Sequence, residues 1–281
     1  MKKYIFMAVA GMLALSSCSN DDNDKLNVQN TPRQMSFTAG YNEGAQMRTY
    51  MDFHLKVSFS ANDEISILSE HNANVKFTTT AGGESATFTG TAVDDTKFYA
   101  VYPYTAGLTL SGTTITGVTI PTSQMNNDWI AYRPSGISAS WDLKAPIAWA
   151  ETTGSNLQFH NLCAILYIYT QGFTPPGTGA TITISADQSL AGTFSLDTSS
   201  GELTATAGSN TITIGSAPND LLVKGNHQLE IAIAPGTYTN FRVVSKMSGS
   251  DLYIVEDKTK SGSVTFEAGK VYNLGGFMMR D

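Results

Sequence analysis

The chain has 281 residues and a formal net charge of −7 at pH 7, from 17 basic and 24 acidic residues. An acidic chain has no bulk attraction for nucleic acid or for anionic lipid head groups, so neither is an expected partner. This length can bury a substantial hydrophobic core, in one large domain or in two domains of ordinary size.

Residues 1–17 predict a signal peptide. Two lysines follow the initiating methionine, and an apolar run then extends from Tyr4 to Leu15. This run is too short to span a bilayer as a helix, which is typical of a secretory signal. The adjoining Leu15-Ser16-Ser17-Cys18 resembles the lipobox of bacterial lipoproteins, in which the cysteine is acylated and becomes the first residue. We therefore expect Cys18 to carry a lipid anchor, the alternative being a cysteine that follows an ordinary signal.

Residues 18–31 are predicted to form an acidic tether behind that anchor. Residues 19–30 are polar, so we expect them to be disordered and to reach roughly 20 Å. An acidic run after a lipidated cysteine resembles the surface-export signal of lipoproteins in certain gut and oral Gram-negative anaerobes; a plain solvated linker is the alternative. Cys163 is the only other cysteine, and its apolar neighbours predict a buried small hydrophobe without a disulfide.

The rest of the chain is predicted to be β throughout. Residues 181–186 alternate between apolar and hydroxylated types, the period of a half-buried antiparallel strand, whereas 162–169 are apolar on both faces. Turn-forming clusters separate such runs, and no convincing amphipathic helix longer than two turns is found. Many short strands indicate β-sandwiches. We expect two, in residues 32–155 and 156–281, because the polar stretch 151–156 is the best boundary.

The sequence contains no recognisable catalytic constellation. The acidic pairs Asp63-Glu64 and Asp94-Asp95 could act as paired carboxylates, but turn residues are the commoner explanation. No nucleophile motif is present, and the histidines lack the spacing of a metal site: His54, His71, His160 and His227. The chain is therefore predicted not to be an enzyme and to need no cofactor or metal.

Four aromatic residues gather in the loop-rich region 122–150: Trp129, Tyr132, Trp141 and Trp149. Exposed rings there could stack on sugars, whereas buried rings would fill the core beneath a long loop. General burial tendencies favour the second alternative.

Several short segments, taken in order, resemble the fimbrillin-like proteins, which are pilin and pilus-accessory lipoproteins of gut and oral Gram-negative anaerobes. The segment 98–104 is the closest match, while Met47, Phe59 and Asn62 depart from the usual residues of the family. The matching segments are 35–39, 47–49, 59–67, 98–104, 120–124, 157–162 and 266–272. The resemblance implies an all-β fold of two tandem transthyretin-like antiparallel β-sandwich domains and an adhesive or pilus-building role.

The resemblance also implies a route of assembly. Pilins of this family are cut after an arginine beyond the first strand, and a strand from a neighbouring subunit then fills the groove. Arg48 is the matching position, so Thr49 would begin the processed chain; the alternative is that Arg48 is an ordinary loop residue. Alternate residues of the first strand could face the core: Met35, Phe37, Ala39 and Tyr41. Loss of the three large ones would forfeit about 5–9 kcal/mol.

Cleavage at Arg48 would also release the lipid anchor, so the anchored and polymerised states would exclude each other. The closing strand is expected near residues 270–274, which leaves few residues to donate. We therefore expect a pilus tip or other minor subunit, at the cell outer membrane or, once processed, in the fimbrium. Its partners would be other fimbrillin subunits, the membrane, and a host protein or glycan. The alternative is a surface glycan-binding β-sandwich lipoprotein that stays anchored.

Overall fold

The structure, a computed structural model, describes residues 31–41, 59–124, 147–172, 179–214, 227–248 and 253–279. Every regular element within these ranges is a β-strand, which confirms the all-β prediction. Two strand pairings, β1 with β9 and β10 with β20, are parallel, and the other ladders between described strands are antiparallel. No helix long and apolar enough to cross a membrane occurs in the described ranges.

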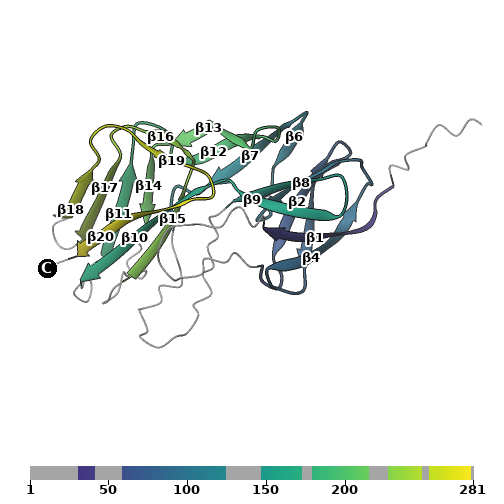
Figure 1. Cartoon of the computed structure of the whole chain (residues 1–281), viewed down its shortest axis with the longest axis horizontal. Helices are drawn as coiled ribbons and strands as arrows, with labels where there is room; N and C mark the ends of the chain where they lie inside the picture. The colour runs from purple at the N-terminus through teal and green to yellow at the C-terminus, as the bar shows by residue number, and fades with distance from the viewer. Residues whose placement is uncertain are drawn as a thin grey trace, which may run out of the picture.

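The N-terminal strands close into a barrel, seen with β1 and β4 in front in Figure 1. Its strands follow the order β1-β4-β3-β2-β5-β8-β9. They span β1 (Arg33–Tyr41), β2 (Glu64–Ser69), β3 (Asn72–Thr79), β4 (Ser85–Ala92), β5 (Phe98–Tyr102), β8 (Ala148–Thr152) and β9 (Asn156–Asn161). The barrel closes because β1 pairs with both β4 and β9. Where both pairings are present, no strand edge is left free.

Aromatic rings fill the barrel interior. Phe37, Phe77 and Phe88 are almost completely buried, and Phe37 packs against Phe77 with ring centroids 5.4 Å apart. A Cβ atom at Gly90 of β4 would come within 2.6 Å of the Phe77 ring. Glycine is therefore required at that position because the ring occupies the space of a side chain.

Four further sheets build the C-terminal region. Three form layers in the orders β15-β10-β20, β14-β11-β17-β18 and β13-β12-β7-β6, and the fourth is the pair β16-β19. Their bounds are β6 (Thr109–Ser111), β7 (Thr114–Ile120), β10 (Ala164–Gly172), β11 (Gly179–Ser185), β12 (Ala191–Asp197), β13 (Glu202–Ser209), β14 (Thr211–Ile214), β15 (His227–Ile233), β16 (Gly236–Tyr238), β17 (Arg242–Ser248), β18 (Tyr253–Thr259), β19 (Val264–Phe266) and β20 (Val271–Met279).

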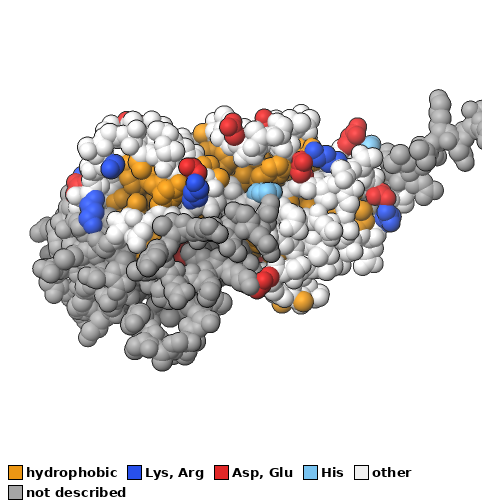
Figure 2. All heavy atoms as spheres, in the orientation of Figure 1, with side chains coloured by type: hydrophobic (Ala, Val, Ile, Leu, Met, Phe, Trp, Pro, Cys, Tyr) orange, Lys and Arg blue, Asp and Glu red, His pale blue; other side chains and the backbone are white. Residues whose placement is uncertain are grey.

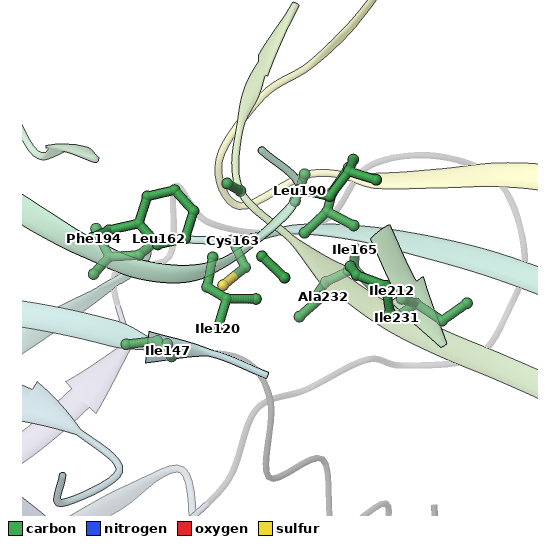
Figure 3. Close-up of a cluster of buried hydrophobic side chains, with 14 of the residues drawn as sticks. Ile120, Ile147, Leu162, Cys163, Ile165, Leu190, Phe194, Ile212, Ile231 and Ala232 are labelled. Carbon is green, nitrogen blue, oxygen red and sulfur yellow. The ribbon is translucent and has the colours of Figure 1, made fainter. Parts of the chain in front are cut away.

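Cys163 lies within the hydrophobic core of this region. Figure 3 shows it between Ile120, Leu162 and Ile165. The thiol is fully buried and free of a disulfide, as predicted, and burial raises the pKa of Cys163 to about 12. Cys163 is therefore a packing residue and not a reactive thiolate.

Backbone pairing between strands crosses the expected domain boundary at residues 155 and 156. β9, expected to open the second sandwich, pairs with β8 and β1 and completes the barrel. β7 lies earlier in sequence but pairs with β12, so that Ile115 faces Leu196 across the ladder. Both residues are buried in the C-terminal core, which is the physical reason for this exchange of strands between the two halves.

Gln124 joins two sheets of the C-terminal region. Its side-chain amide donates to the carbonyl of Ala232 on β15 at 2.6 Å and accepts from the Ala232 amide at 2.9 Å. Its backbone amide donates to Thr213 of β14 at 3.1 Å. Gln124 thus connects β15 to β14. It also supplies hydrogen-bond partners to the buried backbone amide and carbonyl of Ala232, which would otherwise be unpaired.

We expect Gln124→Ala to lower the free energy of unfolding by about 1–3 kcal/mol, because the buried Ala232 amide and carbonyl lose their partners. Chemical denaturation of the full chain measures this change. Gln188→Ala is the matched control: its amide donates to and accepts from Thr239, as the Gln124 amide does with Ala232, but at an exposed position where water can replace it. An equal decrease in the free energy of unfolding in the two variants would show that the buried bonds of Gln124 stabilise the chain no more than the exposed bonds of Gln188 do.

Candidate strand-exchange site

β1 is held unequally by its two neighbours. It pairs with β4 along its length, from Arg33 opposite Ala92 to Gly40 opposite Ser85. Its parallel pairing with β9 covers only Thr38 to Tyr41, and the Thr38 amide donates to the Ser155 carbonyl at 2.8 Å. The first half of β1 is therefore bonded on one side only, which is where exchange of the strand would meet least resistance.

The side chains of β1 alternate between the barrel interior and solvent. Phe37 is 1% exposed and Ala39 is 0% exposed, as the sequence pattern predicts. Met35 and Tyr41 pack against the same core but are only partly buried. The apolar contribution of β1 is therefore smaller than expected for three fully buried large side chains, and Phe37 alone supplies about 1.5–3 kcal/mol of it.

Tyr41 ends β1 in an aromatic cluster. Its ring stacks on Phe59 at a centroid distance of 5.4 Å and tilts against Phe159 of β9 at 5.9 Å. Burial raises the pKa of the Tyr41 phenol far above its ordinary value, and the nearby Tyr102 and Asp63 add to the effect. Tyr41 therefore remains neutral and holds the end of the strand by ring contacts.

The acidic pairs singled out in the sequence make structural contacts. Asp94 forms an ion pair with Arg33 at the start of β1, and Glu64 forms one with Lys76 at 2.9 Å. Asp63 accepts the Ser60 amide at 2.8 Å and the Tyr102 hydroxyl at 3.1 Å. The Arg33–Asp94 pair is solvent-exposed, so it orients the beginning of β1 while adding little stability.

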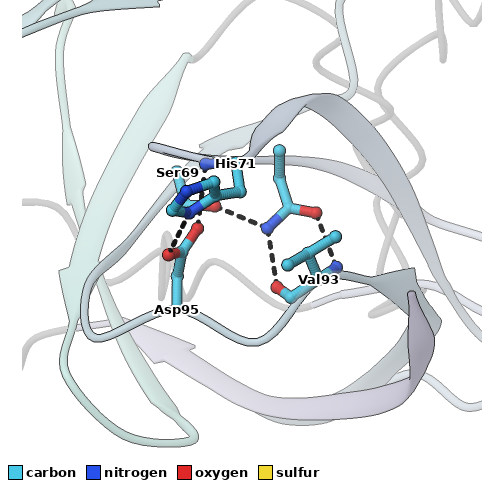
Figure 4. Close-up of polar contacts among 5 residues, drawn as sticks. Ser69, His71, Val93 and Asp95 are labelled. Carbon is cyan, nitrogen blue, oxygen red and sulfur yellow. Dashed lines mark hydrogen bonds and ion pairs between the residues drawn. The ribbon is translucent and has the colours of Figure 1, made fainter. Parts of the chain in front are cut away.

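Asp95, the remaining member, belongs to a polar network that the sequence did not reveal (Figure 4). Its carboxylate contacts His71 Nδ1 at 2.8 Å and accepts the His71 amide at 3.0 Å. The adjacent Asn72 exchanges hydrogen bonds with the amide and carbonyl of Val93 at 2.8 and 2.7 Å. The network ties the β2–β3 turn to the segment after β4, and the bond to Asp95 raises the pKa of His71.

Several predicted positions lie outside the described residues. These are the lipidation residue Cys18, the processing residues Arg48 and Thr49, and the aromatic residues Trp129, Tyr132 and Trp141. Trp149 is described and partly buried, packed against the C-terminal core and 6.3 Å from the His160 ring. A Cβ atom at Gly201 would lie 3.5 Å from the Trp149 ring, so this indole meets the β12–β13 turn.

No group of three or more His, Cys, Asp or Glu side chains arranged to hold a metal occurs in the described part of the chain. The residues gathered around β1 are instead apolar, aromatic and backbone groups. Such groups can hold or release an extended strand, which makes β1 and the walls formed by β4 and β9 the candidate functional site.

No protein-family model matches the chain, and no curated protein is significantly similar to it in sequence. Solved structures do match it. The chain is similar to structures described as putative cell adhesion proteins from Bacteroides ovatus, with 14% identity and a TM-score of 0.48, and from Bacteroides uniformis, with 17% identity and a TM-score of 0.46. In both cases the match covers 86% of this chain and 92% of the other.

The chain is also similar to a fimbrial protein from Bacteroides ovatus, with 12% identity and a TM-score of 0.33. This match covers 79% of the present chain and 46% of the fimbrial protein.

Proposed function

We propose that this chain is a fimbrillin-like surface lipoprotein that acts in adhesion as a pilus tip or minor subunit. Cys18 anchors it to the outer membrane until cleavage after Arg48 frees the chain that begins at Thr49. β1 is then exchanged for a strand of another subunit. The observation that carries the proposal is that β1 precedes Arg48 in sequence and fills the barrel between β4 and β9 with Phe37 and Ala39.

Cleavage by itself would leave β1 seated, because its pairing with β4 and its buried side chains persist. A donor strand would enter first along Arg33–Phe37, where β1 is paired on one side, and then displace the part held by β9. The donor strand would have to place a large apolar side chain at the position of Phe37 and a small one at the position of Ala39.

Residues 275–279, expected to follow the closing strand, are part of β20, and residues 276–279 pair with β10. We therefore assign them to the fold of this subunit and not to a donated strand. The proposal gives this subunit an accepting groove, the one that β1 fills between β4 and β9, with other fimbrillin subunits as donors.

Arg48→Ala tests the processing step. Wild-type protein treated with an Arg-specific protease in the presence of partner subunits should lose its lipid-bound N-terminal part and enter high-molecular-weight fibres. The variant should stay monomeric and lipid-bound, because β1 remains covalently attached. Arg33→Ala, which removes the arginine at the first position of β1, is the matched control and should be processed as wild type is, because cleavage there would not release the strand.

Two readouts separate the parts of this proposal. Metabolic fatty-acid labelling should mark the uncleaved chain and not Cys18→Ala, which reports on the anchor alone. A synthetic peptide with the sequence of residues 33–41 should slow fibre entry of the cleaved chain by competing for the groove. Fibres that contain Arg48→Ala as readily as wild type would mean that Arg48 is a loop residue and that the chain stays anchored.

A further inference from the structure

The ring of Phe59 is the centre of an aromatic cluster at the end of β1. Phe59 is 3% exposed, and Tyr41 stacks on it with ring centroids 5.4 Å apart. Three further rings make edge-on contacts with Phe59, at centroid distances of 5.2 Å for Phe88, 5.6 Å for Tyr102 and 6.1 Å for Phe159. The cluster belongs to the core of the barrel, whose face at the right of Figure 2 shows only small hydrophobic patches. Within this cluster, Tyr41 is the member that β1 supplies.

Backbone hydrogen bonds hold Phe59 in place without help from β1. The Phe59 amide donates to the Gly83 carbonyl at 2.8 Å, and the Phe59 carbonyl accepts the Gly83 amide at 2.9 Å. Asp63 continues this attachment, because its carbonyl accepts the Thr79 amide at 3.0 Å. The backbones also fit closely here, since a Cβ atom at Gly82 would come within 2.5 Å of the Phe59 carbonyl oxygen. The Phe59 ring is therefore a fixed wall that would remain when β1 leaves.

We propose that Phe59 is a specificity-determining residue of the groove that β1 fills, and that it selects an incoming strand with an aromatic side chain at the position of Tyr41. This inference rests on the proposed exchange of β1 and adds a requirement to it. The inward residues of a donor would follow β1 itself: a large apolar residue at Phe37, a small one at Ala39 and an aromatic one at Tyr41. The third requirement also fixes the register, because a shift by two residues would place the ring opposite the buried Ala86 of β4.

An aromatic side chain suits this position better than an aliphatic one. The ring of Tyr41 lies at 27° to the ring of Phe59 and at 38° to the ring of Phe159, whose centroid is 5.9 Å away. Aromatic pairs in such arrangements attract each other beyond the apolar area that they bury. A leucine in the same position would lose this attraction and would leave part of both rings without contacts.

The barrel contains a second strand with the same order of inward residues. In β5 these residues are Phe98, Ala100 and Tyr102. Phe98 packs against Phe37 of β1 with ring centroids 5.1 Å apart, and Tyr102 packs against Phe59, the ring on which Tyr41 stacks. A donor strand with the order of β1 would therefore meet a phenylalanine at one end of this row and two aromatic rings at the other.

Hydrogen exchange of the β1 amides in the uncut full chain tests the role of Phe59, with Cys18→Ser to prevent acylation. Tyr41→Leu should speed the exchange of residues 38–41 by about tenfold, because the ring contacts that hold the end of β1 are lost. Tyr41→Phe keeps the ring and should exchange at nearly the wild-type rate. Tyr41→Leu added to Phe59→Leu should have little further effect, because the wall that distinguishes the two side chains is then absent.

Phe77→Leu is the matched control, because Phe77 is a buried ring that packs on Phe37, four residues before Tyr41. The tenfold effect of Tyr41→Leu should persist in that background. A Tyr41→Leu chain that exchanges at the wild-type rate, or an effect that survives in Phe59→Leu as fully as in Phe77→Leu, would overturn the role of Phe59. If Phe59→Leu does not fold, the comparison of Tyr41→Leu with Tyr41→Phe still decides whether this position requires a ring.

Peptide exchange tests the preference for the donor. After cleavage of the Cys18→Ser chain at Arg48 and removal of the protease, a fluorescent peptide with the sequence of residues 33–41 should replace β1. Fluorescence anisotropy should show about tenfold weaker binding of the Tyr41→Leu peptide and unchanged binding of the Ser36→Ala peptide, since Ser36 is exposed on β1. Equal binding of the wild-type and Tyr41→Leu peptides would overturn the aromatic requirement alone. Failure of every peptide to bind would instead overturn the exchange of β1, and the donor preference with it.

Discussion

Phe37→Ala should lower the free energy of unfolding of the barrel by about 3–5 kcal/mol, the cost of removing a buried phenylalanine and leaving a cavity. Phe37 is 1% exposed and packs against two rings, Phe77 at 5.4 Å and Phe98 at 5.1 Å. These two rings lie on two different strands, β3 and β5, so the barrel cannot easily collapse around the loss. Urea denaturation, followed by hydrogen exchange of the β1 and β4 amides, measures the effect.

Ser36→Ala is the matched control, because Ser36 is the exposed neighbour of Phe37 on the same strand. Its effect should stay within about 0.5 kcal/mol. If β1 is also the exchanged strand, Phe37→Ala should speed its displacement by a partner after cleavage, whereas Ser36→Ala should not. A stability loss of under about 1 kcal/mol for Phe37→Ala would contradict the placement of this ring in the barrel core.

Glu230 should make the stability of the C-terminal region depend on pH. It is 6% exposed on β15, and its Oε2 atom has no hydrogen-bond partner. Burial raises the pKa of Glu230 from its ordinary value of 4.5 to about 7. The folded chain therefore holds a proton on this carboxyl at pH values where the unfolded chain has already released it.

The consequence is a loss of stability as the pH rises. Below about pH 4.5 the contribution of protonated Glu230 is fully present; it declines as the pH rises through about 7 and stays lost above that value. A pKa difference of this size corresponds to about 3 kcal/mol. Glu230→Gln, which keeps the shape without the charge, should raise the free energy of unfolding at pH 8 and change it little at pH 4.5.

Denaturation curves of the full chain at pH 4.5, 6 and 8 measure this dependence. Glu202→Gln serves as the control, since Glu202 is exposed on β13. The gain at pH 8 should appear in Glu230→Gln alone. A Glu230→Gln variant that is no more stable than wild type at pH 8 would contradict this prediction. It would mean that other groups of the folded chain stabilise the ionised carboxylate and offset the cost of its burial.

The sequence by itself determined the fold class and much of the first strand. Alternation with a period of two distinguishes half-buried strands from helices, and it placed Phe37 and Ala39 in the core. Apolar neighbours also identified Cys163 as buried. These conclusions depend on local pattern alone, which is why they needed no knowledge of which strands are neighbours.

Only the tertiary structure decided which strands pair. β9 follows the predicted boundary yet completes the barrel, and β7 precedes it yet pairs with β12. Long-range pairing depends on the path of the whole chain, and a buried strand has the same pattern in either sheet. The same holds for Gln124 and Glu230. Gln124 bonds Ala232, more than a hundred positions away in the sequence. Glu230 is buried by the surrounding core, which leaves its Oε2 atom without a hydrogen-bond partner. No local sequence pattern encodes either environment.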